Sequence, residues 1–277
     1  MSETSEASSL TLKQVDVFTG RPFYGNPVAV VLGGEALETE DMQRIACWVN
    51  LSETTFLLPS SQADYRLRIF TPQHELPFAG HPTIGSAYAA LESGFVEKKK
   101  LLRQECSAGI LDLSFEDERI FVRGPEPRIT DVRRGLPFAK KLLRIEVGPI
   151  WIVGEVADAQ ELAALKPDMG ALAAFTIDHE ATGITVFAPS GEKQTAMHVR
   201  SFAPAHGIPE DPVCGSGNLA VAHYLKQTNA LKRFGERYIA RQGMQMKRDG
   251  RVHVRVDEDG VRIGGRAVTC IEGTLRI

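Results

Sequence analysis

Three polar residues of the chain have the side chains needed to move a proton between carbon atoms. Glu53 directly precedes the apolar segment 54–58, so it is either a surface residue at a strand edge or a desolvated base with a raised pKa. His81 and Asp211 each lie beside a glycine-containing segment, and a histidine near a carboxylate can exchange protons near neutral pH. Taken alone, His81 is also explained as a structural residue of a helix end, and Asp211 as a helix cap.

A cysteine is a further candidate for this chemistry. Cys214 directly precedes Gly215-Ser216-Gly217, which has the composition of a helix start. Because a helix N-terminus lowers the pKa of a nearby thiol, Cys214 is a possible second base. A cysteine–histidine hydrolase is disfavoured, because His223 falls on the body of the expected helix, away from its start.

Two segments have the features of helix starts that bind an acidic molecule. They are Gly80-His81-Pro82-Thr83, with a proline where the first turn tolerates it, and Gly215-Ser216-Gly217-Asn218. Unpaired amides at a helix start attract carboxylates, and glycine lets a ligand approach the backbone. We therefore expect Gly80, Gly215, Ser216 and Gly217 to contact the substrate, although glycines also allow tight strand-to-helix turns.

The two helix starts belong to an internal repeat. The pattern R-x-F-x-P-x-H-x-x-P occurs at residues 68–77 and again at residues 200–209, an offset of 132 residues. From Gly80 to Gly215 the offset is 135, so the second copy carries three extra residues, which fall within residues 210–214. A chain of two related halves commonly has its active site between them, so we expect both helix starts to converge on one small molecule.

The apolar patterns predict many strands and one main buried helix in each half. The buried helices are expected near residues 84–91 and 218–226, and a further helix at 39–49. Shorter helices are expected at 158–164 and 169–174, and strand pairs at 109–115 with 119–123 and at 251–256 with 261–263. The last residues read as two short strands, 267–271 and 275–277. This set of elements favours an α+β fold with two similar halves. In each half a curved, mostly antiparallel, barrel-like sheet surrounds a central helix.

Composition sets the broad class of the protein. The chain has 277 residues, of which 43% are hydrophobic and 24% are charged, as in ordinary globular proteins. Its net charge of −3 gives no indication of a basic surface that would bind nucleic acid. The four cysteines are scattered without metal-ligand spacing, and no apolar run is long enough for a membrane span. We expect a cytoplasmic protein without membrane or nucleic-acid partners and without a metal.

The domain boundaries follow from the repeat and from local composition. Residues 1–9 are polar and acidic and predict a disordered tail. Residues 10–126 form the first half, which ends where Pro125 and Pro127 interrupt the pattern, and residues 127–266 form the second half. The last strand, at about 267–277, is expected to complete the first half.

Five segments together resemble the signature blocks of the PhzF-like isomerases of phenazine biosynthesis. They are D-V-F-T at 16–19, G-N-P-V-A-V at 25–30, S-E-T-T-F at 52–56, F-A-G-H-P-T at 78–83 and E-D-P-V-C-G-S-G at 210–217. The resemblance covers nearly the whole chain in order. It implies the pseudo-symmetric fold shared with diaminopimelate epimerase and proline racemase, a site between the halves, a homodimer, and no metal or organic cofactor.

The resemblance also implies roles for individual residues. Glu53 occupies the position of the glutamate that moves a proton between two carbons of trans-2,3-dihydro-3-hydroxyanthranilate. His81 and Asp211 match the polar partners of that glutamate. Gly80, Gly215 and Ser216 match positions that border and bind the substrate. The expected activity is a cofactor-independent isomerisation of a small carboxylate or amino acid-like substrate.

One departure from the family pattern leaves alternatives open. Cys214 stands where the phenazine enzymes have a threonine, and related racemases use two cysteines, one at each helix start. The first of these positions is Ala79 here, so a symmetric two-thiol racemase lacks one base. An epimerase that pairs Cys214 with Glu53 or His81 remains an alternative, as does a non-catalytic ligand-binding protein that kept the cleft.

Overall fold

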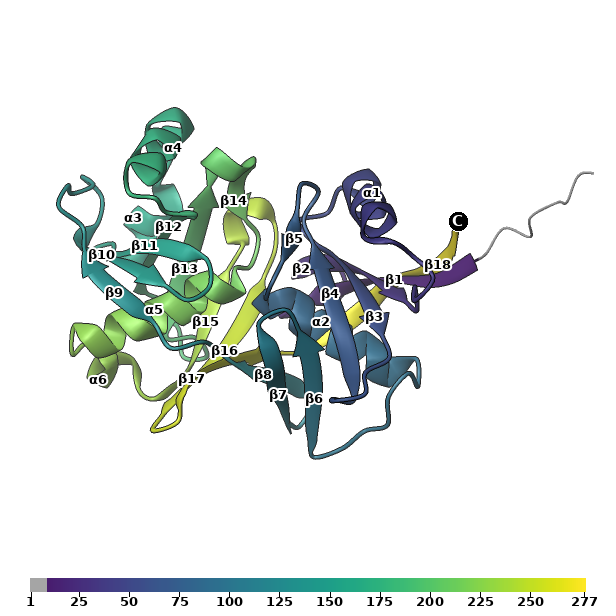
Figure 1. Cartoon of the computed structure of the whole chain (residues 1–277). Helices are drawn as coiled ribbons and strands as arrows, with labels where there is room; N and C mark the ends of the chain where they lie inside the picture. Colours follow the sequence, from purple (N-terminus) through teal and green to yellow (C-terminus); the bar gives the residue numbers. More distant parts are fainter. Residues whose placement is uncertain (1–8) are drawn as a thin grey trace, which may run out of the picture.

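The computed structural model describes residues 9–277 of the chain (Figure 1). The predicted disordered tail lies outside the described residues except for Ser9, which is the first residue of a strand. Within residues 9–277, no helix is long and apolar enough to cross a membrane.

The first half is a curved sheet around one long helix. Its elements are β1 (Ser9–Val17), β2 (Asn26–Leu32), α1 (Thr39–Val49), β3 (Thr54–Leu58), β4 (Tyr65–Phe70), β5 (Glu75–Leu76), α2 (Gly80–Glu92), β6 (Leu101–Cys106), β7 (Gly109–Glu116) and β8 (Arg119–Arg123).

The second half repeats this plan and has three further helices besides its long central one. Its elements are β9 (Arg128–Asp131), β10 (Lys140–Glu146), β11 (Ile150–Glu155), α3 (Ala159–Ala164), α4 (Met169–Asp178), β12 (Gly183–Pro189), β13 (Met197–Ala203), β14 (Ile208–Asp211), α5 (Gly215–Gln227), α6 (Leu231–Phe234), β15 (Arg237–Gln242), β16 (Gly250–Asp257) and β17 (Gly260–Gly265). Two single 3₁₀ turns, Pro204–His206 and Met244–Met246, connect some of these strands.

The two central helices are buried because small and apolar residues cover almost their whole circumference. Helices α2 and α5 each have 13 residues, and most of the side chains of both are buried. Helix α2 packs directly on β1 and β2, since a Cβ atom added to Gly85 would lie 2.5 Å from Val28 and 2.8 Å from Val17. The repeat in the sequence therefore corresponds to two helices with the same place in two similar parts of one continuous sheet.

Hydrogen bonds between strands join the two halves. Strand β17 of the second half pairs antiparallel with β8 of the first half. The last strand, β18 (Ala267–Arg276), then returns to the first half and pairs antiparallel with β1 along its whole length (Figure 1). Parallel pairs recur at matching places, β2 with β3 and β11 with β12. The predicted α+β class and the two-fold repetition of sheet and central helix are confirmed.

The structure corrects some element boundaries. The two short strands expected at the end of the chain are one ten-residue strand, β18. A glycine within a strand weakens it, but Gly273 pairs with Leu12, and β1 supports the strand across this residue. Strands β6, β9, β14 and β15 were not predicted, because they are short or carry many charged residues.

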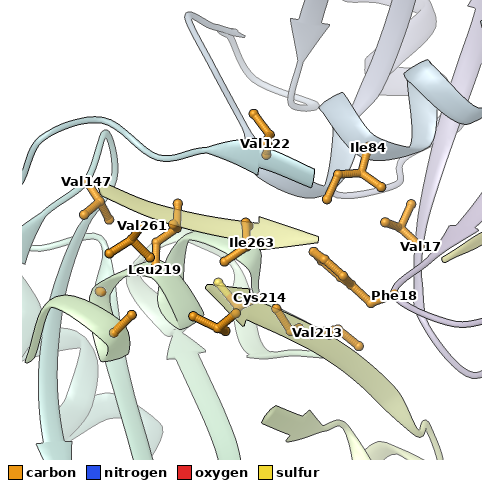
Figure 2. Close-up of a cluster of buried hydrophobic side chains, with 14 of the residues drawn as sticks. Val17, Phe18, Ile84, Val122, Val147, Val213, Cys214, Leu219, Val261 and Ile263 are labelled. Atoms are coloured by element: carbon orange, nitrogen blue, oxygen red, sulfur yellow. The ribbon is translucent and has the colours of Figure 1, made fainter. Parts of the chain in front are cut away.

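A buried hydrophobic cluster continues from one half into the other. Figure 2 shows Phe18 of the first half between Val17 of the same half and Ile263 and Val213 of the second. Phe18 and Ile263 are fully buried. Because this apolar contact lies beside the starts of α2 and α5, it fixes the positions of the two helix starts relative to each other.

Candidate active site

The N-termini of the two central helices meet at Gly80 and Gly215. A Cβ atom on Gly80 would lie 3.9 Å from the Cα of Gly215, and a Cβ atom on Gly215 would lie 3.4 Å from the backbone nitrogen of His81. Both added atoms would also lie 3.0 Å from Ile263. Glycine is needed here for the close approach of two helix starts, whose first-turn amides have no partner within their own helices.

Glu53 lies beside this junction, next to His81. The residue directly precedes β3, and its backbone carbonyl accepts a hydrogen bond from the amide of Ala29 on β2. Its Oε2 atom lies 3.2 Å from Nε2 of His81. The two atoms are not aligned as a hydrogen bond, and among the described residues neither has a hydrogen-bond partner. An unpaired buried carboxylate oxygen next to an unpaired ring nitrogen is costly to keep in a fold, and such groups cluster at functional sites.

Burial sets the charge of both groups. The Glu53 side chain keeps 14% of its surface exposed, but its Oε2 atom is buried. Loss of water around the carboxylate raises the pKa of Glu53 to about 7, against a smaller opposite effect from the Ser52 hydroxyl. Burial lowers the pKa of His81 to about 4, although the charge of Asp211 partly opposes this. At neutral pH, Glu53 can therefore give or take a proton while His81 is uncharged.

Asp211 approaches from the other half of the molecule. It ends β14, and its Oδ1 atom accepts hydrogen bonds from the amide of Val213 and from Nδ2 of Asn26, both at 3.0 Å. Burial raises the pKa of Asp211 to about 6; nearby His81 lowers it and the charge of Glu53 raises it further. The structure thus brings Glu53, His81 and Asp211, which the sequence predicted as site residues, into one cluster.

Asn26 is a residue of this cluster that the sequence interpretation did not select. Its Nδ2 atom also donates to the carbonyl of Val213 at 2.9 Å and lies 3.5 Å from Nδ1 of His81. Asn26 therefore connects the two halves at the site. The sequence signal for Asn26 was the G-N-P block that contains it. Gly25 of this block must be glycine, because an added Cβ atom would lie 2.0 Å from the carbonyl of Val17.

A buried ion pair holds the strand that carries Asp211. The guanidinium of Arg200 forms two hydrogen bonds, of 2.9 and 2.8 Å, with the carboxylate of Glu210. Arg68 and Glu75 form the matching pair in the first half, with two hydrogen bonds of 2.8 and 2.7 Å. The two arginines are the first residues of the repeated sequence pattern, so each half has an arginine clamp between two strands that begins at the same place in the repeat.

The structure corrects the expected reactivity of Cys214. The residue is the N-cap of α5, and its sulfur accepts a hydrogen bond from the amide of Gly217 at 3.2 Å. However, burial and the charge of Asp211 raise the pKa of the thiol well above its usual value. The expectation that the helix start lowers this pKa is wrong, because the thiol lies in the apolar cluster between the halves (Figure 2).

Ser216 and Gly217, the next predicted site residues on α5, differ from each other in their surroundings. Ser216 is partly exposed, and its hydroxyl accepts a hydrogen bond from the indole of Trp151 at 3.0 Å. Gly217 has a packing reason to be glycine, because an added Cβ atom would lie 2.7 Å from the hydroxyl of Thr185 and 2.8 Å from that of Ser201.

Gln242 was not selected from the sequence, yet it fixes the whole connection from β14 to α5. Its side chain accepts a hydrogen bond from the amide of Cys214 and donates one to the carbonyl of Asp211. It also accepts a hydrogen bond from the side chain of Asn218. Within residues 9–277 there is no group of three or more His, Cys, Asp or Glu side chains arranged to hold a metal ion.

Known proteins resemble this chain along nearly its full length. The family model of phenazine biosynthesis-like proteins matches residues 15–273. The antisense-enhancing sequence 1 of Schizosaccharomyces pombe is 37% identical, over 95% of this chain and 97% of that protein. The trans-2,3-dihydro-3-hydroxyanthranilate isomerase of Pseudomonas aeruginosa is 33% identical, over 92% of this chain and 93% of that enzyme.

A solved structure has the same fold as this chain. The Bacillus anthracis phenazine biosynthesis protein of the PhzF family superposes with a TM-score of 0.88 at 28% sequence identity, and the match covers 98% of this chain and 100% of that protein. The resemblance inferred from the five sequence blocks is therefore confirmed over nearly the whole chain.

Proposed function

The chain belongs to the family of phenazine biosynthesis-like proteins and is an isomerase, and we propose that it moves a proton between carbons of a small carboxylate substrate, with Glu53 as base and acid. The observation that carries this proposal is the position of Glu53. Its buried Oε2 atom has no hydrogen-bond partner in the described chain, and it lies beside His81, where the two halves meet.

The chemistry requires one group that first removes and later returns a proton. A pKa of about 7 for Glu53 suits both steps near neutral pH, because neither protonation state is rare. The carboxylate takes a proton from one carbon of the substrate, and the carboxylic acid then gives that proton to another carbon. Proton number and charge balance over the cycle, and Glu53 ends as it began.

The neighbouring groups have supporting roles in this proposal. The first-turn amides of α2 and α5, near Gly80, Gly215 and Ser216, would bind the substrate carboxylate and the negative charge that develops during proton removal. His81, uncharged at neutral pH, would orient Glu53, and Asp211 would in turn position His81 from the opposite half through Asn26. No cofactor is needed for this sequence of steps.

The substrate is proposed only as a chemical class. A relative of this chain acts on trans-2,3-dihydro-3-hydroxyanthranilate, which makes that compound the first candidate to assay. Family membership does not fix the substrate, so other small unsaturated carboxylates and amino acids belong in the same panel. The homodimer implied by the family resemblance stays a prediction.

The epimerase alternative is disfavoured by the state of Cys214. A catalytic thiol must ionise, but burial raises the pKa of this thiol well above its usual value. At the other helix start the matching residue is Ala79, which has no proton to exchange.

The test is the turnover of the substrate panel by Glu53→Gln, which keeps the shape of the side chain and removes the base. We expect the kcat of the variant to fall at least about 100-fold, the usual scale of general acid–base catalysis. Glu38→Gln, an exposed glutamate of the same half, is the matched control and should keep full activity. Activity of Glu53→Gln within tenfold of the wild type would show that another group transfers the proton.

A further inference from the structure

A cavity of about 290 Å³ is lined by residues of both halves, and its lining does not include Glu53, His81 or Asp211. Its charged and aromatic lining residues are Arg119, Arg251, Arg266, His253, Asp249 and Phe18. We refer to it as the basic pocket. Its volume is near the lower end of the range of roughly 300–1,000 Å³ that is typical of small-ligand sites.

The lining carries more positive than negative charge. Three guanidinium groups face one carboxylate, that of Asp249, which is already held by Arg241 at 2.6 Å and by Arg251 at 3.3 Å. The carboxylate of Asp249 is therefore shared between two arginines and does not neutralise the pocket.

The remaining two arginines have only weak partners. Arg119 pairs with Asp117 and Arg266 with Glu118, each at 3.0 Å. Both carboxylates belong to the turn between β7 and β8, and their side chains are 72% and 75% exposed. Exposed ion pairs of this kind contribute little, so both guanidinium groups are able to exchange such a partner for a ligand.

The charges of the three arginines all lower the pKa of the same lining residue, His253. His253 is partly buried on β16, and its pKa is lowered to about 4, first by burial and then by the charges of Arg119, Arg266 and Arg251. The same four side chains thus surround a region of positive potential that one carboxylate, Asp249, only partly offsets.

Three of the four basic side chains are carried by paired strands. Arg251 and His253 are two residues apart on β16 and therefore point to the same face of the sheet. Arg119 begins β8, and Arg266 connects β17 with β18. Because β16, β17 and β8 are consecutive hydrogen-bonded strands, the basic groups come from both halves but belong to one continuous surface.

One wall of the basic pocket is shared with the candidate active site. The carbonyl of Phe18 accepts a hydrogen bond of 2.8 Å from the amide of Arg251. The end of the Phe18 ring would lie 3.5 Å from a Cβ atom on Gly215, at the start of α5. Phe18 has a φ angle of 66°, in the left-handed region that is costly for a bulky residue, so packing on both sides holds it there.

We propose that the basic pocket is a second ligand site, which binds a small polyanion carrying a phosphate group or several carboxylates. Planar guanidinium groups bind both kinds of anion through paired hydrogen bonds. This proposal does not depend on the proposed isomerase activity, because no residue of the basic pocket takes part in the proton transfer.

The test is calorimetric titration of the full-length protein with inorganic phosphate and, separately, with citrate, at constant ionic strength. We expect saturable binding of at least one anion, weakened roughly tenfold or more in Arg119→Gln/Arg266→Gln, because two charge-assisted contacts are lost. Tighter binding of phosphate would support a phosphorylated ligand, and tighter binding of citrate a polycarboxylate.

The matched control is Arg123→Gln/Arg237→Gln, which removes two exposed, ion-paired arginines outside the pocket and changes the net charge equally. It should bind each anion within about twofold of the wild type, the change expected for distant surface substitutions. Equal weakening in both double variants, or no binding of either anion to the wild type, would overturn the proposal.

A second readout follows His253 in the wild-type protein. A bound anion should raise the pKa of His253 by offsetting the charges of Arg119, Arg251 and Arg266, with Asp249 as the only other charged group of the lining. Proton NMR of the His253 ring, assigned with His253→Gln, would follow this change. An imidazole pKa that does not move at saturating anion would also overturn the proposal.

Discussion

The carboxylate of Glu53 and the imidazole of His81 lie 3.2 Å apart, and burial favours the uncharged form of each. The pKa of Glu53 is raised to about 7 while that of His81 is lowered to about 4. The attraction between the two groups alone would favour their charged forms, which would lower the pKa of Glu53 and raise that of His81. Loss of solvent therefore outweighs the mutual attraction of the two groups, and the result is a carboxyl group that changes charge near neutral pH.

This relationship predicts a pH-dependent stability difference for Glu53→Gln. Between the ordinary glutamate pKa of 4.5 and the folded value of about 7, the native protein binds more protons than the unfolded chain, so its stability falls as pH rises. At pH 8.5 the variant should be more stable than the wild type by about 3 kcal/mol, and at pH 5 by less than about 1 kcal/mol. Urea unfolding at both pH values measures this, and a difference that does not depend on pH would contradict the raised pKa.

The cysteines should differ strongly in reactivity. Cys47 is exposed, whereas Cys214 is buried and the pKa of its thiol is raised. A disulfide reagent such as DTNB should modify Cys47 rapidly in the native protein and leave Cys214 unmodified until the chain unfolds. Cys47→Ser should remove the rapid phase, and Cys214→Ser should leave it unchanged. Rapid labelling of Cys214, located by peptide mass spectrometry, would restore the thiol-based epimerase alternative.

The two repeated arginine clamps should contribute unequally to stability. Arg200 and Glu210 are 6% and 12% exposed, whereas Arg68 and Glu75 are 16% and 28% exposed. Arg200→Gln leaves a largely buried carboxylate without its charge partner and should lower the free energy of unfolding by about 3 kcal/mol. Arg68→Gln, its counterpart in the repeat, should cost about 1 kcal/mol, because water can solvate Glu75. If urea unfolding showed the same loss of unfolding free energy in both variants, the expected effect of burial on the two clamps would be wrong.

Gly217 should be intolerant of a side chain for reasons of packing. The methyl group of Gly217→Ala would collide with the hydroxyls of Thr185 and Ser201, so the variant should lose about 1–3 kcal/mol of stability. Gly135→Ala is the matched control, since nothing lies within 4 Å of its added Cβ atom, and it should change stability by less than about 0.5 kcal/mol. If Gly217→Ala kept wild-type stability in thermal unfolding, contact with substrate would become the better reason for glycine at this position.

Much of the fold could be predicted from the sequence, because its main features leave local signals. The repeat at Arg68 and Arg200 predicted two similar halves, and the small, apolar segments after Gly80 and Gly215 predicted two buried helices. The pairing of β18 with all of β1 could not be recognised locally, since strand partners far apart in the chain decide where a strand ends.

The site was predicted less completely, and for a different reason. Glu53, His81 and Asp211 were candidates from their residue types and positions, but the family resemblance was needed to group them, because spacing along the chain does not reveal which side chains meet. Asn26 and Gln242 act through contacts between distant segments and were not selected. The pKa of Cys214 was predicted in the wrong direction, because burial outweighs the effect of a helix start and burial is not visible in the sequence.

The measurement that tests the proton transfer most directly is proton NMR in D₂O, with trans-2,3-dihydro-3-hydroxyanthranilate and a panel of small carboxylates and amino acids as substrates. The wild type should introduce deuterium at a carbon of at least one compound, and Glu53→Gln should do so at least about 100-fold more slowly. Glu38→Gln should match the wild type. Deuterium uptake by Glu53→Gln within tenfold of the wild-type rate would contradict the central role of Glu53.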